Sequence, residues 1–273
     1  MQETLIIDGH VHVYPQFDSK SMIEAARRNF RISQHRSNNR DEAVKVWLLT
    51  ERSDCAFFNH APTRLEDFIV EPSGEPEALI VRDAGTREPL LYILAGRQIV
   101  TRERLEICAL ATLFFVGDGE LSASEAVRAV NDAGGIAAVN WAPGKWFGAR
   151  GRTVERLFNE FSPQQLLISD TTMRPTVWPT PRLMATAVKS GYRIVCGSDP
   201  LPFSGEEQMV ARYAFLVQGD FDDGRPATSI RKILADAAHF TPCGRRSGLF
   251  QFVRRQSRIM REKNVPSLSC AAK

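Results

Sequence analysis

The chain has 273 residues, of which 43% are hydrophobic and 25% are charged, and its formal net charge is +3. This length can bury a sizeable core in one large α/β domain or in two small ones, and the composition is ordinary for a globular protein. The charge is too small to indicate a nucleic-acid partner by itself, no apolar run is long enough for a membrane span, and no leader segment indicates secretion.

The N-terminal part of the chain opens with a short apolar run at residues 4–7, followed by Asp8 and Gly9. This pattern is typical of a buried strand that ends in a turn. A helix is expected over residues 21–32, because its apolar side chains fall on one face. The next ten residues, 33–42, are polar and are expected to form a loop.

A second strand is expected over residues 44–49, whose nearly continuous apolar character suits burial on both faces of a parallel sheet. Residues 51–100 contain short apolar runs separated by proline, glycine and acidic residues. These spacings predict hairpins inserted on one side of the fold rather than a crossover helix.

The second half of the chain shows a regular alternation of strands and helices. A capping box at Ser122 and Glu125 predicts a helix that ends at Gly134 and Gly135. Further elements are predicted as follows: an apolar run at 107–116, strands at 136–139, 166–168 and 194–196, a helix around 154–161, a helix from Thr180 and Pro181 to Gly191, helices near 206–217 and 229–238, and a basic helix at 249–261.

This alternation indicates βαβ units and a mostly parallel sheet. About six or seven such strands in a chain of this length fit a barrel better than an open sheet. In either architecture the ligand site lies beyond the carboxyl ends of the strands. We expect one domain over residues 1–263 and a flexible tail over residues 264–273.

His10 and His12 are the sharpest chemical feature of the sequence. They stand two residues apart at the carboxyl end of the first predicted strand, so both side chains point to the same face. Two converging imidazoles are a natural half of a divalent-metal site. Two ordinary polar residues at a loop start are the less favoured interpretation.

Two aspartates also end predicted strands. Asp199, in residues 197–199 (GSD), follows the strand at 194–196 and could bind metal or act as a general base, although a helix cap would also explain it. Asp170 ends the strand before it and could join the same site or simply cap a turn. Arg150, Arg152 and Arg174, with Lys145 close by, lie in loops at this end and could receive a phosphate or a carboxylate. A solvated basic face explains these cations equally well.

Three segments carry a family resemblance. Residues 8–12 (DGHVH) resemble the opening motif of PHP (polymerase and histidinol phosphatase) and amidohydrolase-like proteins, residues 133–140 (AGGIAAVN) look like the family's GGIAVLAHP strand, and residues 197–199 are similar to its GSDAH strand. They occur in the family's order across nearly the whole chain. The resemblance implies a distorted (β/α)7 TIM-like barrel and, in intact members, up to three metals that hydrolyse phosphate esters.

The sequence departs from the family pattern at several ligand positions. The residues at these positions are Glu51 and Arg52 where the family has an Asp-His pair, Gln98 for a glutamate, Glu106 for a histidine, Asn140 or Trp141 for the histidine of AHP, and Leu201 for the last histidine. A guanidinium repels a cation, and Gln and Asn are weak donors. A trinuclear cluster is therefore untenable, whereas a single Zn²⁺ or Mn²⁺ on His10, His12 and Asp199, with Glu51 or Glu106 helping, remains feasible.

Three hypotheses follow. The favoured one is a metal-dependent hydrolase, with phosphoesterase-like chemistry through a metal-activated water. Its proton acceptor would be Asp199, Asp170 or Glu106, and its substrate-binding residues would be Arg52, Arg150, Arg174 and Asn140. The alternative is a degenerate, non-catalytic barrel that binds a ligand or a protein, with Arg52 ion-paired to Glu106 or Asp199. A third is an assembly role for residues 51–100 and the basic C-terminal helix.

The expected partner is a small anionic substrate, with no nucleic acid and no membrane. The five cysteines show neither a zinc-knuckle nor a redox CxxC spacing, so we expect a cytoplasmic protein with free thiols. The sequence does not indicate an oligomeric state.

Overall fold

The computed structural model describes residues 2–36 and 42–263. Its strands are β1 (Glu3–Val11), β2 (Val44–Leu49), β3 (Arg64–Leu65), β4 (Phe68–Pro72), β5 (Ala78–Asp83), β6 (Pro89–Leu94), β7 (Gly96–Val100), β8 (Glu106–Leu110), β9 (Ile136–Asn140), β10 (Leu167–Thr171), β11 (Ile194–Gly197), β12 (Tyr213–Gly219) and β13 (Thr241–Gly244). Its helices are α1 (Ser19–Arg36), α2 (Phe57–His60), α3 (Ala123–Asp132), α4 (Gly148–Glu160), α5 (Arg182–Lys189), the 3₁₀ turn η1 (Glu206–Met209), α6 (Pro226–Asp236) and α7 (Leu249–Lys263).

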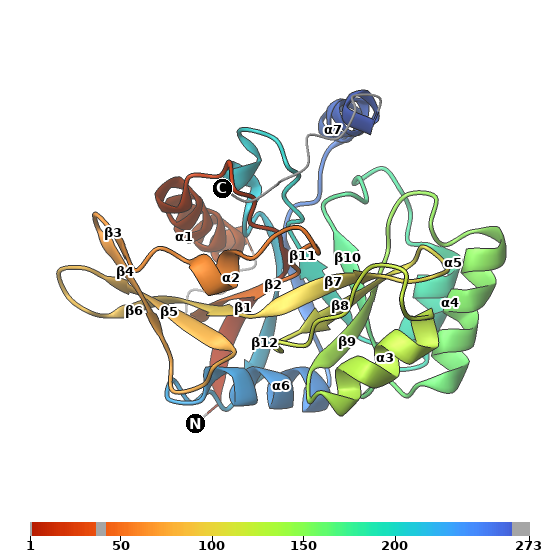
Figure 1. Cartoon of the computed structure of the whole chain (residues 1–273), viewed down its shortest axis with the longest axis horizontal. Coiled ribbons are helices and arrows are strands. Elements are labelled where there is room, and N and C mark those ends of the chain that lie inside the picture. Colours follow the sequence, from red (N-terminus) through yellow and green to blue (C-terminus); the bar gives the residue numbers. More distant parts are fainter. Residues whose placement is uncertain (1, 37–41, 264–273) are drawn as a thin grey trace.

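The strands form two sheets. The larger has the order β13-β12-β1-β2-β6-β5-β4-β3, and the smaller has the order β11-β10-β9-β8-β7. Strand β1 is parallel to β2 and antiparallel to β12, so the first strand of the chain lies deep inside the larger sheet. In Figure 1 the hairpins of β3 to β6 extend at one end of the molecule, and α3, α4 and α5 lie at the other.

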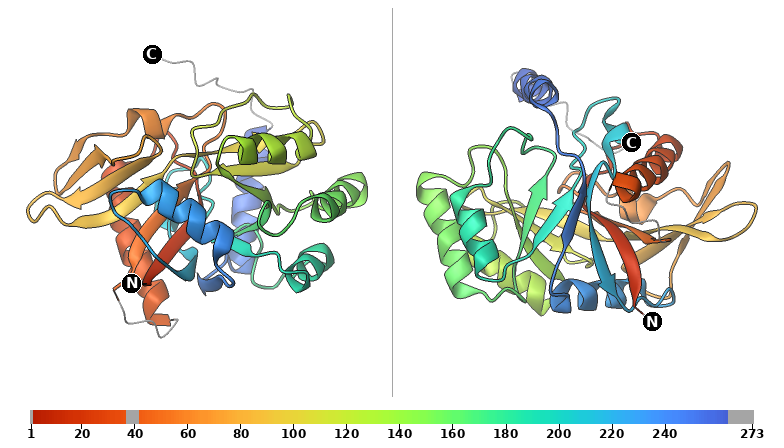
Figure 2. Two further views of the ribbon diagram at one scale, coloured as in Figure 1. Left: turned by 90° about the horizontal axis from the view of Figure 1, so that it is seen from below. Right: turned by 180° about the vertical axis from the view of Figure 1, so that it is seen from behind.

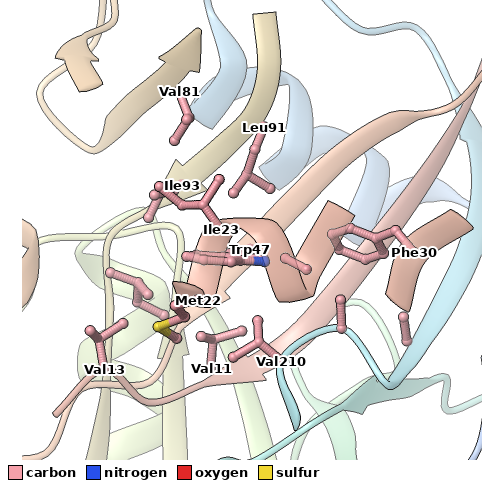
Figure 3. Packing of buried hydrophobic residues seen from close by; sticks show 14 of the residues in the cluster. Val11, Val13, Met22, Ile23, Phe30, Trp47, Val81, Leu91, Ile93 and Val210 are labelled. Carbon is pink, nitrogen blue, oxygen red and sulfur yellow. The ribbon is translucent and has the colours of Figure 1, made fainter. Parts of the chain in front are cut away.

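The core is layered. Helix α1 packs on one face of the larger sheet, where Met22, Ile23 and Phe30 surround Trp47 of β2 (Figure 3). The other face packs against the smaller sheet and α6, and a third apolar layer joins the smaller sheet to α3, α4 and α5. Removal of this much apolar surface from water is the main stabilising contribution to the fold.

The two sheets meet at a very close crossing of β1 and β11. A Cβ atom on Gly197 would lie 2.3 Å from Cβ of His10, and one on Gly9 would lie 2.0 Å from Cγ1 of Val195. Only glycine therefore allows the two strands to approach this closely. This crossing places the carboxyl end of β11 directly against His10.

Several sequence-based expectations are confirmed. Strand β2 spans the predicted residues, the antiparallel hairpins of β3 to β6 occupy residues 64–94 of the predicted 51–100 segment, and the capping box at Ser122 and Glu125 begins α3. Helix α1 continues to Arg36, so the first four residues of the expected 33–42 loop are helical. Residues 37–41, and the tail expected at 264–273, lie outside the described residues. Thr180 does not cap α5, whose N-cap position is Pro181.

The helix expected at 206–217 is wrong. Only η1 is helical, and residues from Tyr213 onward form β12, which pairs antiparallel with β1. Ala211 adopts a left-handed backbone (φ 61°), which breaks the helix, and the aromatic and β-branched residues that follow suit a strand. Strand β13, which was not predicted, extends the same edge of the sheet.

The α/β class is confirmed, but the mostly parallel sheet is not. Strand β8 is antiparallel to both of its neighbours, and the two sheets are mixed. No continuous ladder closes the described strands into a barrel. None of the helices in the described part of the chain combines the length and apolar character that a membrane span needs.

Candidate metal centre

His10 and His12 lie side by side at the end of β1. Their Nε2 atoms are 3.1 Å apart, and the rings meet edge to face. Because side chains alternate along an extended strand, residues two apart share a face, as the sequence predicted. On its other side, His10 Nδ1 lies 3.1 Å from Ser169 Oγ and 3.6 Å from Cys108 Sγ. A hydrogen bond from Nδ1–H to Ser169 Oγ leaves Nε2 as the lone-pair donor that a metal ion needs.

Asp199 completes the cluster from the end of β11. Its Oδ1 lies 3.5 Å from His12 Nε2 and 3.9 Å from His10 Nε2, and its Oδ2 accepts a hydrogen bond of 2.9 Å from Thr171 Oγ1. Its backbone N–H donates to the carbonyl of His10 at 2.9 Å. Its φ of 50° is left-handed, a conformation that costs a non-glycine residue about 1–3 kcal/mol and marks sites where the surroundings impose the geometry.

The spacing of the three donor atoms fits one metal ion. Ligands about 2.0–2.1 Å from a tetrahedral zinc ion lie about 3.3 Å from one another, which falls within the observed separations of 3.1 to 3.9 Å. These three residues form the one group of this kind within the described ranges, and all three are buried. Two imidazoles and one carboxylate are also a donor set that zinc and manganese accept.

The protonation states favour a cation. Burial, reinforced by the neighbouring His10, lowers the pKa of His12 to about 3, so this imidazole is neutral at neutral pH and its nitrogen can bind a metal. Burial raises the pKa of Asp199, but His10 and His12, with Arg255 and the Thr171 hydrogen bond, outweigh it and hold the pKa below its ordinary value. At neutral pH the site therefore offers an ionised Asp199 carboxylate beside a neutral His12 imidazole.

Asp8, two residues before His10, holds together the segments that carry the cluster. Its fully buried carboxylate accepts hydrogen bonds from Ser198 N at 2.8 Å, Ser198 Oγ at 2.5 Å and Ala211 N at 2.7 Å. These bonds tie β1 to the segments that follow β11 and precede β12. Burial raises the pKa of Asp8 to about 7, against the effect of the hydrogen bonds. This aspartate therefore positions the strands and does not reach the cleft.

Two members of the cluster, His12 and Asp199, line a cleft of about 610 Å³, and the fully buried His10 lies next to them. The side chains that line the cleft come from six parts of the chain: His12 and Tyr14; Arg52; Gln98 and Glu106; Asn140 and Lys145; Asp199, Leu201 and Phe203; and Gln256 and Ile259, among others. A cleft of this size accommodates a small molecule.

The opposite wall of the cleft carries a second polar group. Glu106 accepts hydrogen bonds from Asn140 Nδ2 at 2.9 Å and from Lys145 Nζ at 2.5 Å. The structure therefore brings Glu106 and Asn140 to the cleft, as the sequence predicted, but Lys145 occupies the Glu106 carboxylate. This wall presents a cation and an amide to the cleft in place of open metal ligands.

Two residues at the end of β2 depart from their expected places. Glu51 is buried but accepts the backbone N–H of Phe58 at 3.0 Å and lies 3.8 Å from Arg97, in a separate small pocket, so it is not brought to the histidines. Arg52 lies at the cleft rim and pairs with Asp54 at 3.0 Å, not with Glu106 or Asp199. Its guanidinium does not fill the space between the imidazoles and the carboxylate.

Three other candidates from the sequence have structural partners. Both carboxylate oxygens of Asp170 bind the guanidinium of Arg174, at 2.7 and 2.5 Å, in a buried ion pair, and Tyr213 adds a contact at 3.3 Å. Neither partner lines the cleft. Arg150 donates to the carbonyl of Gly144 at 2.8 Å near the start of α4 and also lies outside the cleft lining.

The sequence analysis missed three residues that line or support the candidate site. Tyr14 continues the alternation of His10 and His12, and its ring centroid is 5.7 Å from that of His12, so the same period of two could have identified it. Gln256 and Arg255 come from α7, whose inner face borders the cleft. Nothing in the sequence indicates that the C-terminal helix folds back onto the end of β11.

No protein-family model matches the chain, and no curated protein matches it. Among solved structures, it is similar to PsfC from Pseudomonas syringae PB-5123, with 12% identity and a TM-score of 0.57 over 96% of this chain and 99% of that one. Similarity at this level concerns the fold alone.

Two further solved structures are more distant. One is a two-domain protein containing a predicted PHP-like metal-dependent phosphoesterase from Bacteroides vulgatus ATCC 8482, with 13% identity and a TM-score of 0.48 over 89% of this chain and 66% of that one. The other is the lesion-specific endonuclease PfuEndoQ from Pyrococcus furiosus, with 10% identity and a TM-score of 0.47 over 88% and 57%. A protein with a predicted PHP-like domain is thus among the solved structures that the chain resembles.

The expectation that nucleic acid plays no part is wrong as a general exclusion. The similar structures include that lesion-specific endonuclease and an endonuclease Q bound to a duplex substrate. The exclusion was drawn from net charge, which averages over the whole surface and does not describe any single face.

Proposed function

We propose that this chain is a metal-dependent hydrolase that acts on a small anionic substrate, and that a phosphate ester is the substrate class to test first. One observation carries the proposal. The ligand atoms of His10, His12 and Asp199 converge at the floor of a cleft, at separations of 3.1 to 3.9 Å. The facing wall supplies a cation, Lys145, that suits an anionic substrate.

His10, His12 and Asp199 would hold one divalent cation, Zn²⁺ or Mn²⁺. Such an ion, when bound, supplies Lewis acidity and lowers the pKa of a water molecule in the site. The chain's own part is to orient the donors: Ser169 fixes the His10 ring through Nδ1, and Thr171 holds Oδ2 of Asp199 so that Oδ1 faces the imidazoles.

The opposite wall supplies the proton acceptor and the charge. We assign Glu106 to accept a proton because its carboxylate lines the cleft, whereas Asp199 serves as a ligand and Asp170, bound by Arg174, lies outside the cleft lining. Lys145 Nζ, beside Glu106, would attract and orient the anion, and Arg52 at the rim would assist.

The alternative of a non-catalytic binding module has less support. It requires Arg52 to neutralise Glu106 or Asp199 in place of a metal ion, whereas Arg52 pairs with Asp54. We further propose that the two sheets represent a distorted PHP-type barrel in which β1 and β11 adjoin without forming a hydrogen-bonded ladder. The close crossing of these strands at Gly9 and Gly197 supports this interpretation.

The first test is the metal content of untagged protein by elemental mass spectrometry. We expect about one equivalent of zinc or manganese in the wild type and almost none in the His10→Ala/His12→Ala variant, because the loss of two of three ligands opens the site. The His35→Ala/His60→Ala variant removes two exposed histidines and should keep its metal. Wild-type protein that stays metal-free in excess Zn²⁺ and Mn²⁺ would make the non-catalytic module the better assignment.

The second test is activity on a panel of phosphate monoesters and diesters. Glu106→Gln should lower kcat by about 10²- to 10⁴-fold without changing metal content, because it removes a proton acceptor but no ligand. Full activity in this variant would contradict the role assigned to Glu106, and activity that persists in the His10→Ala/His12→Ala variant would contradict the metal-dependent mechanism.

A further inference from the structure

Helix α7 has two contrasting faces. Its outer face exposes Phe250, which is 95% accessible, whereas Arg255 on its inner face is only 2% accessible. The inner face also places Gln256 and Ile259 in the lining of the metal cleft. In Figures 1 and 2 the helix stands at the end of the molecule opposite α6. A buried guanidinium is costly unless its donors are satisfied, so the partners of Arg255 indicate why it is there.

The partners of Arg255 lie at the end of β11 and in the loops around it. Its Nη2 donates to the backbone carbonyl of Asp199 at 2.6 Å and lies 2.8 Å from Oε2 of Glu206. Its Nη1 donates to Oγ1 of Thr172 at 2.7 Å, and Thr172 Oγ1 in turn donates to the carbonyl of Ser198 at 2.5 Å. The guanidinium therefore contacts the peptide groups on both sides of the Asp199 Cα, one directly and one through Thr172.

Asp199 needs such support because its backbone is left-handed. Its amide is held by the His10 carbonyl, its Oδ2 by Thr171 and its carbonyl by Arg255. Only Oδ1 remains directed at the two imidazoles. If the carbonyl were released, the peptide after Asp199 could rotate, and the carboxylate would lose the direction that the cluster needs.

We propose that Arg255 is a positioning residue of the metal centre: from α7, it fixes the Asp199 backbone so that the Asp199 carboxylate faces His10 and His12. This inference rests on the proposed metal site. The competing explanation is that Arg255 only anchors α7 through its ion pair with Glu206. Anchoring needs a single positive charge, whereas positioning needs the two-pronged guanidinium, which reaches Asp199 and Thr172 at once.

The test compares Arg255→Lys with Arg258→Lys. Arg258 lies on the same helix, with its guanidinium carbon Cζ 4.4 Å from the ring centroid of Phe203, and serves as the matched control. Isothermal titration of each metal-free protein with Zn²⁺ gives the affinity. Arg255→Lys should bind Zn²⁺ about 10- to 100-fold more weakly than the wild type, the usual cost of losing a group that orients a ligand, and Arg258→Lys should bind within about twofold.

A second readout needs no metal. The imidazole NMR resonances of His10 and His12 should shift in Arg255→Lys and not in Arg258→Lys, because Asp199 Oδ1 lies beside both rings. Millimolar guanidinium should restore Zn²⁺ affinity to Arg255→Ala by occupying the vacated place. If this alanine variant does not fold, the lysine variant decides the question by itself.

The outcomes separate the two proposals. Wild-type affinity and unshifted resonances in Arg255→Lys would overturn the positioning role, and so would equal losses in both lysine variants. If the wild type binds no Zn²⁺, the proposed function fails. In that case the histidine resonances alone test the role of Arg255. A shift specific to Arg255→Lys supports the positioning role, and unchanged spectra overturn that role.

Discussion

The two walls of the cleft differ in how their charged groups are partnered. On the side of β1 and β11, His10, His12 and Asp199 direct their ligand atoms at one another, and the remaining polar atoms of Asp199 are held by neutral donors or by Arg255. On the side of β8, the carboxylate of Glu106 already has Lys145 beside it, and in the neighbouring pocket at the end of β2 Glu51 lies 3.8 Å from Arg97.

This difference limits how many ions the cleft can hold. A carboxylate binds a divalent cation well only if no ammonium or guanidinium competes for its oxygens. The first wall satisfies that condition and the second does not. The family resemblance implied up to three metals in intact members, whereas the partnering of these side chains favours one metal and an anion-binding wall.

The largest expected effect is a loss of stability when Asp170 loses its ion pair. Asp170 lies on the side of the histidines, but like Glu106 it already has a cation, Arg174, beside it. Arg174→Ala leaves Asp170 buried without its counter-ion, which should lower the free energy of unfolding by about 3–5 kcal/mol, measured by urea denaturation. The Asp170→Asn/Arg174→Met variant removes both charges and should lose much less. If Arg174→Ala instead kept its stability and bound an additional metal equivalent, Asp170 would belong with the potential ligands.

The next effect concerns Lys145. Lys145→Met should weaken binding of inorganic phosphate by about tenfold, because it removes the positive charge from the anion-facing wall, while metal content stays the same. Phosphate affinity is measured by calorimetry on the metal-loaded protein. Uptake of a second metal equivalent in this variant would show that Lys145 alone keeps Glu106 from acting as a ligand, and the contrast between the walls would then depend on a single residue.

The smallest effect concerns Glu51. Glu51→Gln should leave Zn²⁺ affinity within about twofold of the wild type, because Glu51 lies in a separate pocket from the cluster. A loss as large as that of a histidine variant would contradict the division into two walls.

The same variant makes a prediction about pH. Burial raises the pKa of Glu51, so its ionisation is less favourable in the folded chain than in the unfolded one. The wild type therefore loses stability from this group as the pH rises through the folded pKa, and Glu51→Gln should not. Urea unfolding of both proteins at about pH 4 and about pH 8 checks the sign: the variant's relative stability should increase at the higher pH.

The grouping of His10, His12 and Asp199 was predictable because its signals are local. The alternation of His10 and His12 and the strand before Asp199 place these ligands on one edge wherever parallel strands end together. The α3 capping box and the hairpins within residues 51–100 were predictable for the same reason. In each case neighbours in the sequence determine the geometry.

Features that depend on distant partners were not predictable. Strand β12 was expected as a helix because its apolar side chains fit both the helical period of about 3.6 residues and the strand period of about 2. Only its pairing with β1 selects the strand. Glu51, Glu106 and Asp170 looked equivalent as candidate carboxylates until their cations, Arg97, Lys145 and Arg174, were located. The role of Arg255 depends on the path of α7, which no local pattern specifies.

The pairing of β1 with β12 has a consequence for synthesis of the protein. The ribosome makes His10 and His12 first, yet Asp8 beside them binds the amide of Ala211, 203 residues later in the chain. One edge of β1 therefore stays unpaired until β12 has been synthesised, and such long-range pairing slows folding and leaves a strand edge open to aggregation. Because Asp199 and Arg255 come from segments far along the chain from His10 and His12, a chain truncated before β11 cannot bring the three residues of the cluster together.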